Sequence, residues 1–95
     1  MATITQPRTP FAIDGDATIY AASDLFERIK AVLQGSGTIE LDLAHVTEID
    51  TAGVQLLLLL KREADLAQRP LRLLGASPPV REVLRMLDLR AALRG

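Results

Sequence analysis

The chain has 95 residues, which suits one domain built around a single hydrophobic core. Apolar residues make up 48% of the sequence and the net charge is −1, so the basic footprint of a nucleic-acid-binding or anionic-lipid-binding protein is excluded. The chain has no cysteine, which excludes disulfides and thiol chemistry and fits a reducing compartment. We therefore expect a single cytoplasmic domain spanning residues 1–95.

The sequence predicts neither a targeting segment nor membrane insertion. Residues 1–10 lack the basic region and apolar stretch of a secretory signal. The leucine run at residues 56–60 follows Gln55 and is closed by the charged residues 61–63. It falls far short of the roughly 20 apolar residues that a membrane-spanning helix needs. This run is expected to be a buried helix.

The start of the chain predicts short strands. Residues 1–10 are typical of an edge strand or a loose arm that ends at prolines. Residues 11–13 are apolar and lead into a turn at residues 14–16, and a second short strand is expected at residues 17–19.

A helix and a half-buried strand come next. Apolar side chains recur every three or four positions from residue 20 to residue 33, which predicts the first helix, and the glycines of residues 35–37 end it. Apolar and acidic residues then alternate over residues 38–43, as they do in a strand with one buried face. A polar turn is expected after this strand, with Val46 and Ile49 turned back toward the core.

Asp50 stands where a helix N-cap belongs. Its carboxylate can accept a hydrogen bond from the amide of Ala52 or Gly53, and its charge opposes the positive end of the helix dipole. Thr51 is then the first helical residue, at an end where an added phosphate would be tolerated. Gly53 costs the helix roughly 1 kcal/mol relative to alanine. Its presence indicates that a partner surface or a neighbouring strand approaches the backbone closely there.

The second half of the chain predicts two helices around a short strand. The main helix is expected from Thr51 to about Ala67, since Pro70 follows as a terminator. Residues 71–74 are predicted to be a strand, and residues 75–76 a turn.

The third helix is predicted from its start signal. Ser77 is the expected N-cap, and Pro78 occupies the favoured first position. The tail at residues 88–93 is expected to pack Leu89 back onto the domain. The core stripe of the third helix is expected to consist of Val80, Val83, Leu84 and Leu87.

The main helix has more apolar residues than one face needs. The side predicted to be buried carries Leu56, Leu57, Leu60, Ala64 and Ala67, and the opposite side carries Gln55, Arg62, Asp65 and Arg69. Leu58 falls in the second group, between Gln55 and Arg62. Such a leucine is typical of a docking surface, but single exposed leucines are also common in proteins without one. The sequence leaves both interpretations of Leu58 open.

The start of this helix resembles a known family. Between the strand at residues 41–43 and the leucine-rich helix stands the motif Ile49-Asp50-Thr51-Ala52-Gly53-Val54. It resembles the signature of STAS domains, the small sulfate-transporter and anti-sigma-factor-antagonist domains, and the resemblance covers most of the chain. The fold it implies is a STAS-like (SpoIIAA-like) α/β domain, a small mixed sheet of about four strands packed against helices.

The resemblance bears on regulation by phosphorylation. In the anti-sigma factor antagonists (anti-anti-sigma factors) the motif is Asp-Ser-Ser-Gly, and a partner kinase phosphorylates the second serine. Ala52 stands at that position here, so Thr51 is the candidate phosphoacceptor. Thr18 replaces the last acid of a second family motif, Gly-Glu-Leu-Asp, which also weighs against a phosphorylation switch.

The Asp-Thr-Ala-Gly version of the motif resembles MlaB-like stand-alone STAS proteins. These include the STAS subunit of the bacterial phospholipid-transport ABC complex, in which this threonine region docks on the ATPase. The implied partner is a kinase-like anti-sigma factor, a chemosensory component or an ABC transporter ATPase. The sequence does not predict the oligomeric state.

The residues themselves predict a binding module rather than an enzyme. The sequence contains no paired serine and histidine of recognisable order, no glycine-rich phosphate loop and no zinc-ligand spacing, so no cofactor or metal is expected. His45 has no histidine partner, which favours a solvated loop position over a metal ligand. Two functions remain open, a bacterial signal-transduction module switched at Thr51 and a constitutive accessory subunit of a phospholipid-type ABC transporter ATPase. In both, the expected partner-binding residues are Asp50, Thr51, Ala52, Gly53, Gln55, Leu58 and Arg62.

Overall fold

Strands and helices alternate along the chain, as the sequence predicts. A computed structural model describes residues 8–86. Three parts of the predictions therefore lie outside the described residues: residues 1–7 of the expected N-terminal arm, Leu87, and the expected C-terminal tail at residues 88–93. None of the helices within residues 8–86 combines the length and the hydropathy that a membrane span requires. In chain order the elements are β1 (Arg8–Ala12), β2 (Gly15–Ala17), the 3-10 turn η1 (Ile19–Ala21), α1 (Ala22–Leu33), β3 (Thr38–Leu43), β4 (Val46–Ile49), α2 (Thr51–Leu66), β5 (Leu71–Ala76) and α3 (Pro78–Met86).

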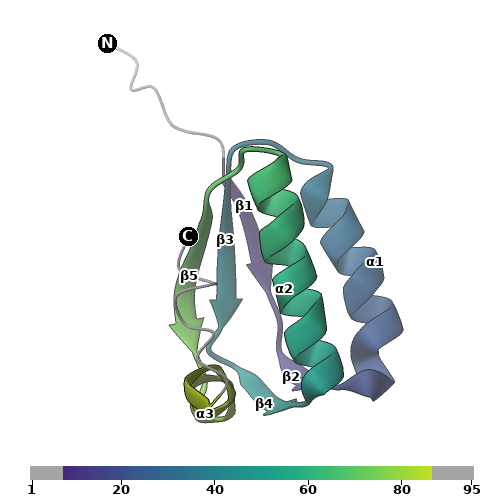
Figure 1. Ribbon diagram of the computed structural model, residues 1–95, viewed down its shortest axis with the longest axis vertical. Coiled ribbons are helices and arrows are strands. Elements are labelled where there is room, and N and C mark those ends of the chain that lie inside the picture. The colour runs from purple at the N-terminus through teal and green to yellow at the C-terminus, as the bar shows by residue number, and fades with distance from the viewer. Residues whose placement is uncertain (1–7, 87–95) are drawn as a thin grey trace.

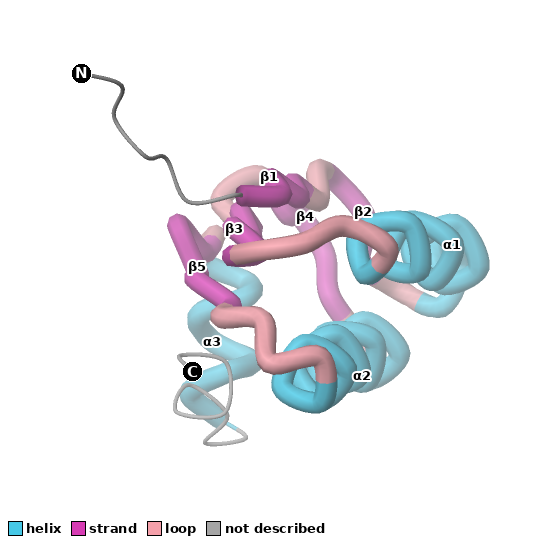
Figure 2. Tube along the Cα trace, turned by 90° about the horizontal axis from the view of Figure 1, so that it is seen from above, coloured by secondary structure: helices cyan, strands magenta, loops and turns pink. Residues whose placement is uncertain are grey.

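The strands form two sheets (Figure 1). One has three strands in the order β1-β3-β5, the other pairs β2 with β4, and every pairing among the described residues is parallel. Parallel neighbours need long crossover connections, which α1 and α2 supply. Both helices lie on the same face of β1-β3-β5 (Figure 2), whereas α3 packs beside β4. The expected STAS-like α/β architecture is confirmed, with its strands divided between two sheets.

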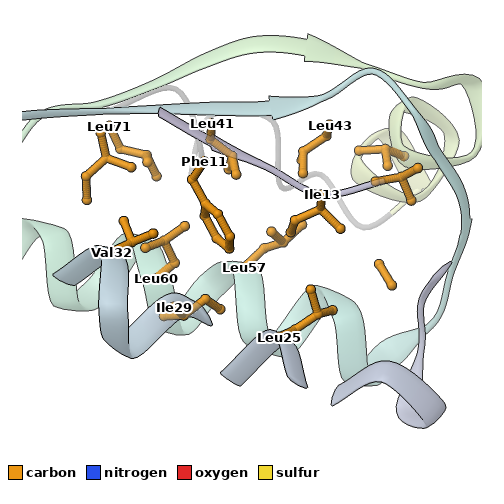
Figure 3. Close-up of a cluster of buried hydrophobic side chains, with 14 of the residues drawn as sticks. Phe11, Ile13, Leu25, Ile29, Val32, Leu41, Leu43, Leu57, Leu60 and Leu71 are labelled. Atoms are coloured by element: carbon orange, nitrogen blue, oxygen red, sulfur yellow. The ribbon is translucent and has the colours of Figure 1, made fainter. Parts of the chain in front are cut away.

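The core lies between the central sheet and helices α1 and α2 (Figure 3). On β3, Ile39, Leu41 and Leu43 are at most 1% exposed, which confirms the predicted alternation. Each fully buried aliphatic side chain of this kind stabilises the fold by roughly 1.5–3 kcal/mol. The largest side chains that the core buries most completely are Ile13, Ile29, Ile39, Leu41, Leu43, Val46, Leu57, Leu60 and Val80.

The boundaries of several elements differ from the predictions. The expected turn after β3 contains β4, whose Val46 pairs with Gly15 and whose Ile49 pairs with Ala17. A strand of four residues paired with a strand of three is too short to show a period in the sequence. The second predicted strand lies earlier than expected, since residues 19–21 form η1 and α1 begins at Ala22.

The C-terminal ends of α2 and β5 differ as well. Ala67 is the exposed C-cap of α2 rather than a buried helical residue. The predicted turn at residues 75–76 is the end of β5, where Gly75 pairs with Asp42 after a register shift. The start of α3 is as predicted, because Ser77 is 4% exposed and its hydroxyl accepts from the amide of Val80 at 3.5 Å.

Arg69 was predicted on the solvent side of the main helix, and this prediction is wrong. The residue is buried, with 6% of its surface exposed. α2 ends at Leu66, and Gln68 adopts a left-handed φ of 57°. The chain therefore changes direction just before Arg69, which no longer lies on the helix. The guanidinium then donates to the carbonyls of Gly37 and Val32 at 2.8 Å each and to the hydroxyl of Thr9 at 2.9 Å. Arg69 therefore ties β1, the α1–β3 loop and the α2–β5 loop together at the amino ends of the strands.

Candidate partner-binding site at the start of helix α2

Asp50 joins the start of α2 to the segment that precedes α1. One carboxylate oxygen accepts from the amide of Gly53 at 3.1 Å, which confirms the predicted N-cap. The other oxygen accepts from the amide of Ile19 at 3.0 Å, a bond the sequence did not reveal. The bond from Ile19 is the largest cause that holds the pKa of Asp50 below its ordinary value, since both bonds favour the charged carboxylate. Asp50 is thus an ionised structural cap at the centre of the site.

Gly53 is buried because the end of β2 packs directly against it. A Cβ at this position would lie 1.9 Å from the carbonyl oxygen of Ala17 and 3.1 Å from Cγ1 of Ile49. Of the two explanations that the sequence left open, the neighbouring strand is therefore correct. The same carbonyl accepts from the amide of Asp50 at 3.3 Å, so β2 fixes the first turn of α2 at two points.

The remaining predicted residues form a stripe along α2. Thr51, Gln55 and Arg62 are exposed, and Leu58 is half-buried between the last two. Spacings of three and four place all of them on one side of the helix. Ala52 is half-buried beside Asp50, so Thr51 presents the accessible hydroxyl at residues 50–53. We call residues 50–53 the rim.

Two residues beside the rim were missed by sequence reasoning. Ile19 is 63% exposed and Tyr20 is 93% exposed, although both are large and apolar or aromatic. They belong to η1, whose N-cap Thr18 accepts from the amide of Tyr20 at 3.4 Å. The signal in the sequence is that both residues precede the buried stripe of α1, which begins in the structure at Leu25.

A groove of about 250 Å³ also borders Thr51, between the start of α2 and α3. Val54 and Val83 contribute apolar lining, and Met86 stands at its edge with 68% of its surface exposed. Asp50 and Thr51 complete the lining that the described residues provide. Exposed apolar side chains therefore lie near the rim both on η1, at Ile19 and Tyr20, and at this groove, at Met86.

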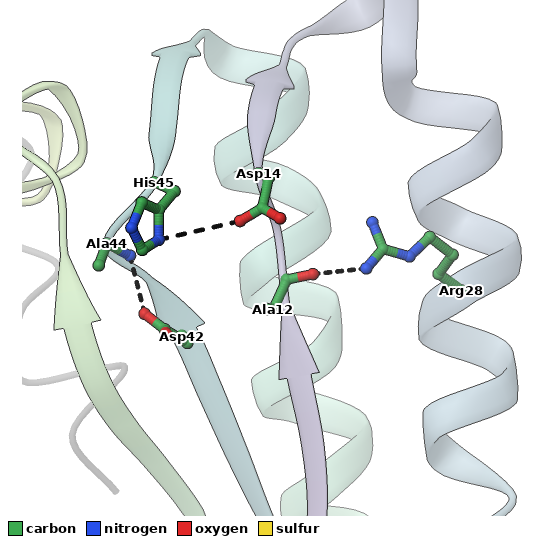
Figure 4. A network of polar contacts seen from close by, with 6 residues as sticks. All are labelled: Ala12, Asp14, Arg28, Asp42, Ala44 and His45. Carbon is green, nitrogen blue, oxygen red and sulfur yellow. Dashed lines mark hydrogen bonds and ion pairs between the residues drawn. The ribbon is translucent and has the colours of Figure 1, made fainter.

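A second cluster of polar groups lies in the turns after β1 and β3 (Figure 4). Nδ1 of His45 is 4.0 Å from a carboxylate oxygen of Asp14, and both side chains are 76% exposed. Asp42 accepts from the amide of Ala44 at 2.9 Å, which stabilises the turn itself. Within residues 8–86, no group of three or more histidines and acids is placed to hold a metal ion. These contacts serve to shape the turns.

The parallel strands, the capped start of α2 and the glycine packed on the backbone in its first turn agree with the α/β architecture that the sequence motif implied. The chain is similar to the unphosphorylated anti-sigma factor antagonist SpoIIAA, with 26% identity and a TM-score of 0.72 over 93% of this chain and 78% of that one. Residues 4–95 match the family described as "Mlab, STAS domain", and the chain belongs to that family. The predicted family is thereby confirmed.

Two further solved structures share the fold. A sulfate transporter family protein from Wolinella succinogenes is 20% identical, with a TM-score of 0.75 over 90% of this chain and 70% of that one. The phosphorylated form of the Bacillus cell fate determinant SpoIIAA is 21% identical, with a TM-score of 0.71 over 99% of this chain and 86% of that one. A comparison with curated protein sequences gave no significant match.

Proposed function

We propose that this protein is a cytoplasmic, non-catalytic binding module that engages a larger regulatory or ATPase partner through the rim and the exposed stripe of α2. The observation that carries this proposal is the placement of Thr51. It is exposed at the first position of α2, directly after a cap residue whose two carboxylate oxygens are both hydrogen-bonded to the backbone. The stripe then continues along the same helix with Gln55, Leu58 and Arg62.

The rigidity of the rim supports this role. Its backbone is held by the bonds of Asp50 to Gly53 and Ile19 and by the packing of Gly53 on Ala17. A surface that is already ordered loses little conformational entropy when a partner binds, so more of the contact energy appears as affinity.

The amino end of the α2 dipole supports control by phosphorylation at Thr51. A phosphate on Thr51 would be stabilised by the amino end of the α2 dipole and would stand next to the ionised carboxylate of Asp50. The added charge would change the surface that a partner meets while leaving the capping bonds in place. The relative with 26% identity is an anti-sigma factor antagonist, which supports a regulatory partner.

A specific observation favours the second candidate, a constitutive accessory subunit of a phospholipid-type ABC transporter ATPase. Thr18 stands where the resemblance places a motif aspartate, and it is 8% exposed with its hydroxyl engaged by the amide of Tyr20. Ala52 offers no hydroxyl at the usual acceptor position. In this mode the rim binds without phosphorylation, and membership of the Mlab-type family supports it.

An affinity pull-down from the native host tests both candidates. Wild type, Thr51→Glu and the matched control Thr47→Glu, which alters another exposed threonine on β4, are compared by mass spectrometry of the retained proteins and of residue 51. A kinase-like or chemosensory partner with phosphate on wild-type Thr51 supports the switch. An ABC ATPase that binds unmodified wild type and Thr47→Glu but not Thr51→Glu supports the accessory subunit. If Thr51→Glu retains every partner, the rim is not the interface.

A further inference from the structure

The two-stranded sheet that leads into the rim carries two acidic side chains next to each other. Asp16 of β2 pairs with Glu48 of β4, and both are exposed. Paired residues of neighbouring strands point to the same face, which here is opposite to the face of Ala17 and Ile49 that packs on the core. Like charges at paired positions repel each other and lower stability. The sheet therefore keeps a repulsive pair of carboxylates on a surface that faces solvent.

The acidic side chains around the rim have no basic partner within residues 8–86. No ion pair there involves Asp16, Glu48 or Asp24, the exposed acid in the first turn of α1. Other acidic side chains do have a lysine or arginine nitrogen within 4.0 Å, namely Glu27, Glu40, Asp65 and Glu82. Asp50 adds a further negative charge, since its hydrogen bonds from backbone amides favour the carboxylate. Negative charge is thus left uncompensated at this end of the domain.

Two exposed side chains of η1 lie among these charges. The amide of Ile19 donates to Asp50, and Tyr20 follows directly with 93% of its surface exposed. Covering Ile19 would remove apolar surface from water, which is favourable. The face of an exposed tyrosine ring attracts a cation, most often the guanidinium of an arginine. This surface therefore suits an occupant that carries both apolar and cationic side chains.

A second copy of the chain supplies few cations that are free to bind there. The exposed arginines of α3 are already engaged, because Arg85 donates to Glu82 at 2.6 Å and Arg81 donates to the carbonyl of Ala76 at 3.0 Å. Nucleic acids and anionic lipids are excluded by the sign of the charge at the rim. These observations favour a different protein as the occupant.

We propose that the partner meets the rim with a cationic segment, in which an arginine or lysine lies against Asp16 and Glu48 and a neighbouring apolar side chain covers Ile19 and Tyr20. Binding of this segment would relieve the repulsion between the two carboxylates. The inference rests on the proposed function, because it gives the chemistry of the partner at the same site.

A peptide titration tests the charge of the occupant directly. The probe is a short peptide in which arginine alternates with leucine, added to the ¹⁵N-labelled full chain while the amide signals are recorded by NMR. We expect the signals of Tyr20, Glu48 and Thr51 to shift most. The affinity should fall about threefold or more when the salt concentration rises from about 0.05 M to about 0.5 M, since exposed charges are screened.

A peptide of glutamate and leucine in the same pattern is the control for this titration and should leave the three signals unchanged. No shift of these signals with the arginine peptide, or equal shifts with both peptides, would overturn the proposal. If the same signals shift when the chain alone is concentrated, a second copy is the occupant and the proposal is wrong.

Neutral variants of the two acids test their part in the contact. Asp16→Asn/Glu48→Gln should weaken binding of the arginine peptide about tenfold. The matched control is Glu27→Gln/Glu82→Gln, which removes the same charge from ion-paired acids of α1 and α3 and should bind like wild type. Equal losses in the two double variants would refute a specific contact. Asp16→Asn/Glu48→Gln should also unfold at a higher denaturant concentration than wild type, and a lower one would contradict the repulsion.

The same double variant separates this inference from the proposed function in the pull-down described above. A partner lost from both Thr51→Glu and Asp16→Asn/Glu48→Gln supports the cationic segment. A partner lost from Thr51→Glu alone leaves the proposed function standing and refutes the cationic segment. A partner retained by both variants contradicts the two proposals together.

Discussion

The carbonyl oxygen of Ala17 occupies the space in which any side chain at Gly53 would begin, at 1.9 Å from the position of a Cβ. Gly53→Ala should therefore lower the free energy of unfolding by about 1–3 kcal/mol through overpacking. This loss outweighs the gain in helix propensity of roughly 1 kcal/mol. Chemical denaturation measures the difference. Gln55→Ala, at an exposed position in the same helix, is the control and should change stability little. A stabilised Gly53→Ala variant would show that β2 does not pack on α2 in this way.

Ionisation of Asp50 should appear in the pH dependence of stability. The pKa of Asp50 is lowered in the folded state, so its contribution is complete above the unfolded value of about 3.9 and is lost as the pH falls through the folded value. Asp50→Asn should be less stable than wild type at neutral pH, and the difference should shrink as the solution is acidified below pH 4. Denaturation curves from neutral to acid pH test this.

Asp16→Asn removes one negative charge at an exposed position of β2 and serves as the control for net charge. If Asp50→Asn and Asp16→Asn change the free energy of unfolding by the same amount at every pH, the hydrogen bonds of Asp50 do not stabilise its charged form.

Replacement of Arg69 should destabilise the fold without altering the rim. Arg69→Met leaves several acceptors at the amino ends of the strands without their donor, and we expect a loss of about 3 kcal/mol in the free energy of unfolding. Arg69→Lys should recover only part of this, since one ammonium group cannot reach acceptors on three segments. Arg72→Met, on the outer face of β5, should lie within about 0.5 kcal/mol of wild type. An Arg69→Met variant as stable as Arg72→Met would refute the assignment.

Tyr20 should matter to binding and not to stability. Its side chain is 93% exposed, so Tyr20→Ala should change the free energy of unfolding by less than about 0.5 kcal/mol. Once the partner is known, the same variant should weaken binding by about tenfold or more, as tyrosines at the centre of interfaces do. Calorimetric titration measures this. Leu66, at the opposite end of α2, is exposed as well, at 71%. Leu66→Ala is therefore the control and should bind like wild type. Equal affinities of all three proteins would place Tyr20 outside the interface.

The features that sequence reasoning predicted correctly are those encoded locally. Alternation along β3 and the cap at Asp50 each depend on residue types within a few positions. The close approach at Gly53 was signalled by the glycine itself, although the segment that approaches it, Ala17, could not be named from the sequence. The features it missed depend on residues far apart in the chain. The buried position of Arg69 follows from the left-handed turn at Gln68 and from acceptors more than thirty residues away, which no local pattern encodes.

The candidate site divides in the same way. Thr51, Gln55 and Arg62 are exposed as predicted, because helical spacing alone places them on one side of α2. The exposure of Ile19 and Tyr20 beside Asp50 was not predicted, since it depends on a turn that the first-helix pattern concealed.

The bond between Ile19 and Asp50 spans 31 positions of the sequence. The segment between them contains α1, β3 and β4, so Ile19 and Asp50 meet only when these elements are in place, and the complete rim is a property of the folded domain. On the function proposed above, a partner would therefore find its complete binding surface only on the folded domain. Such a partner also stabilises what it recognises, because any ligand that binds only the native state shifts the folding equilibrium toward it. The carboxylate of Asp50 would thus link partner binding at the rim to the folded state of the domain.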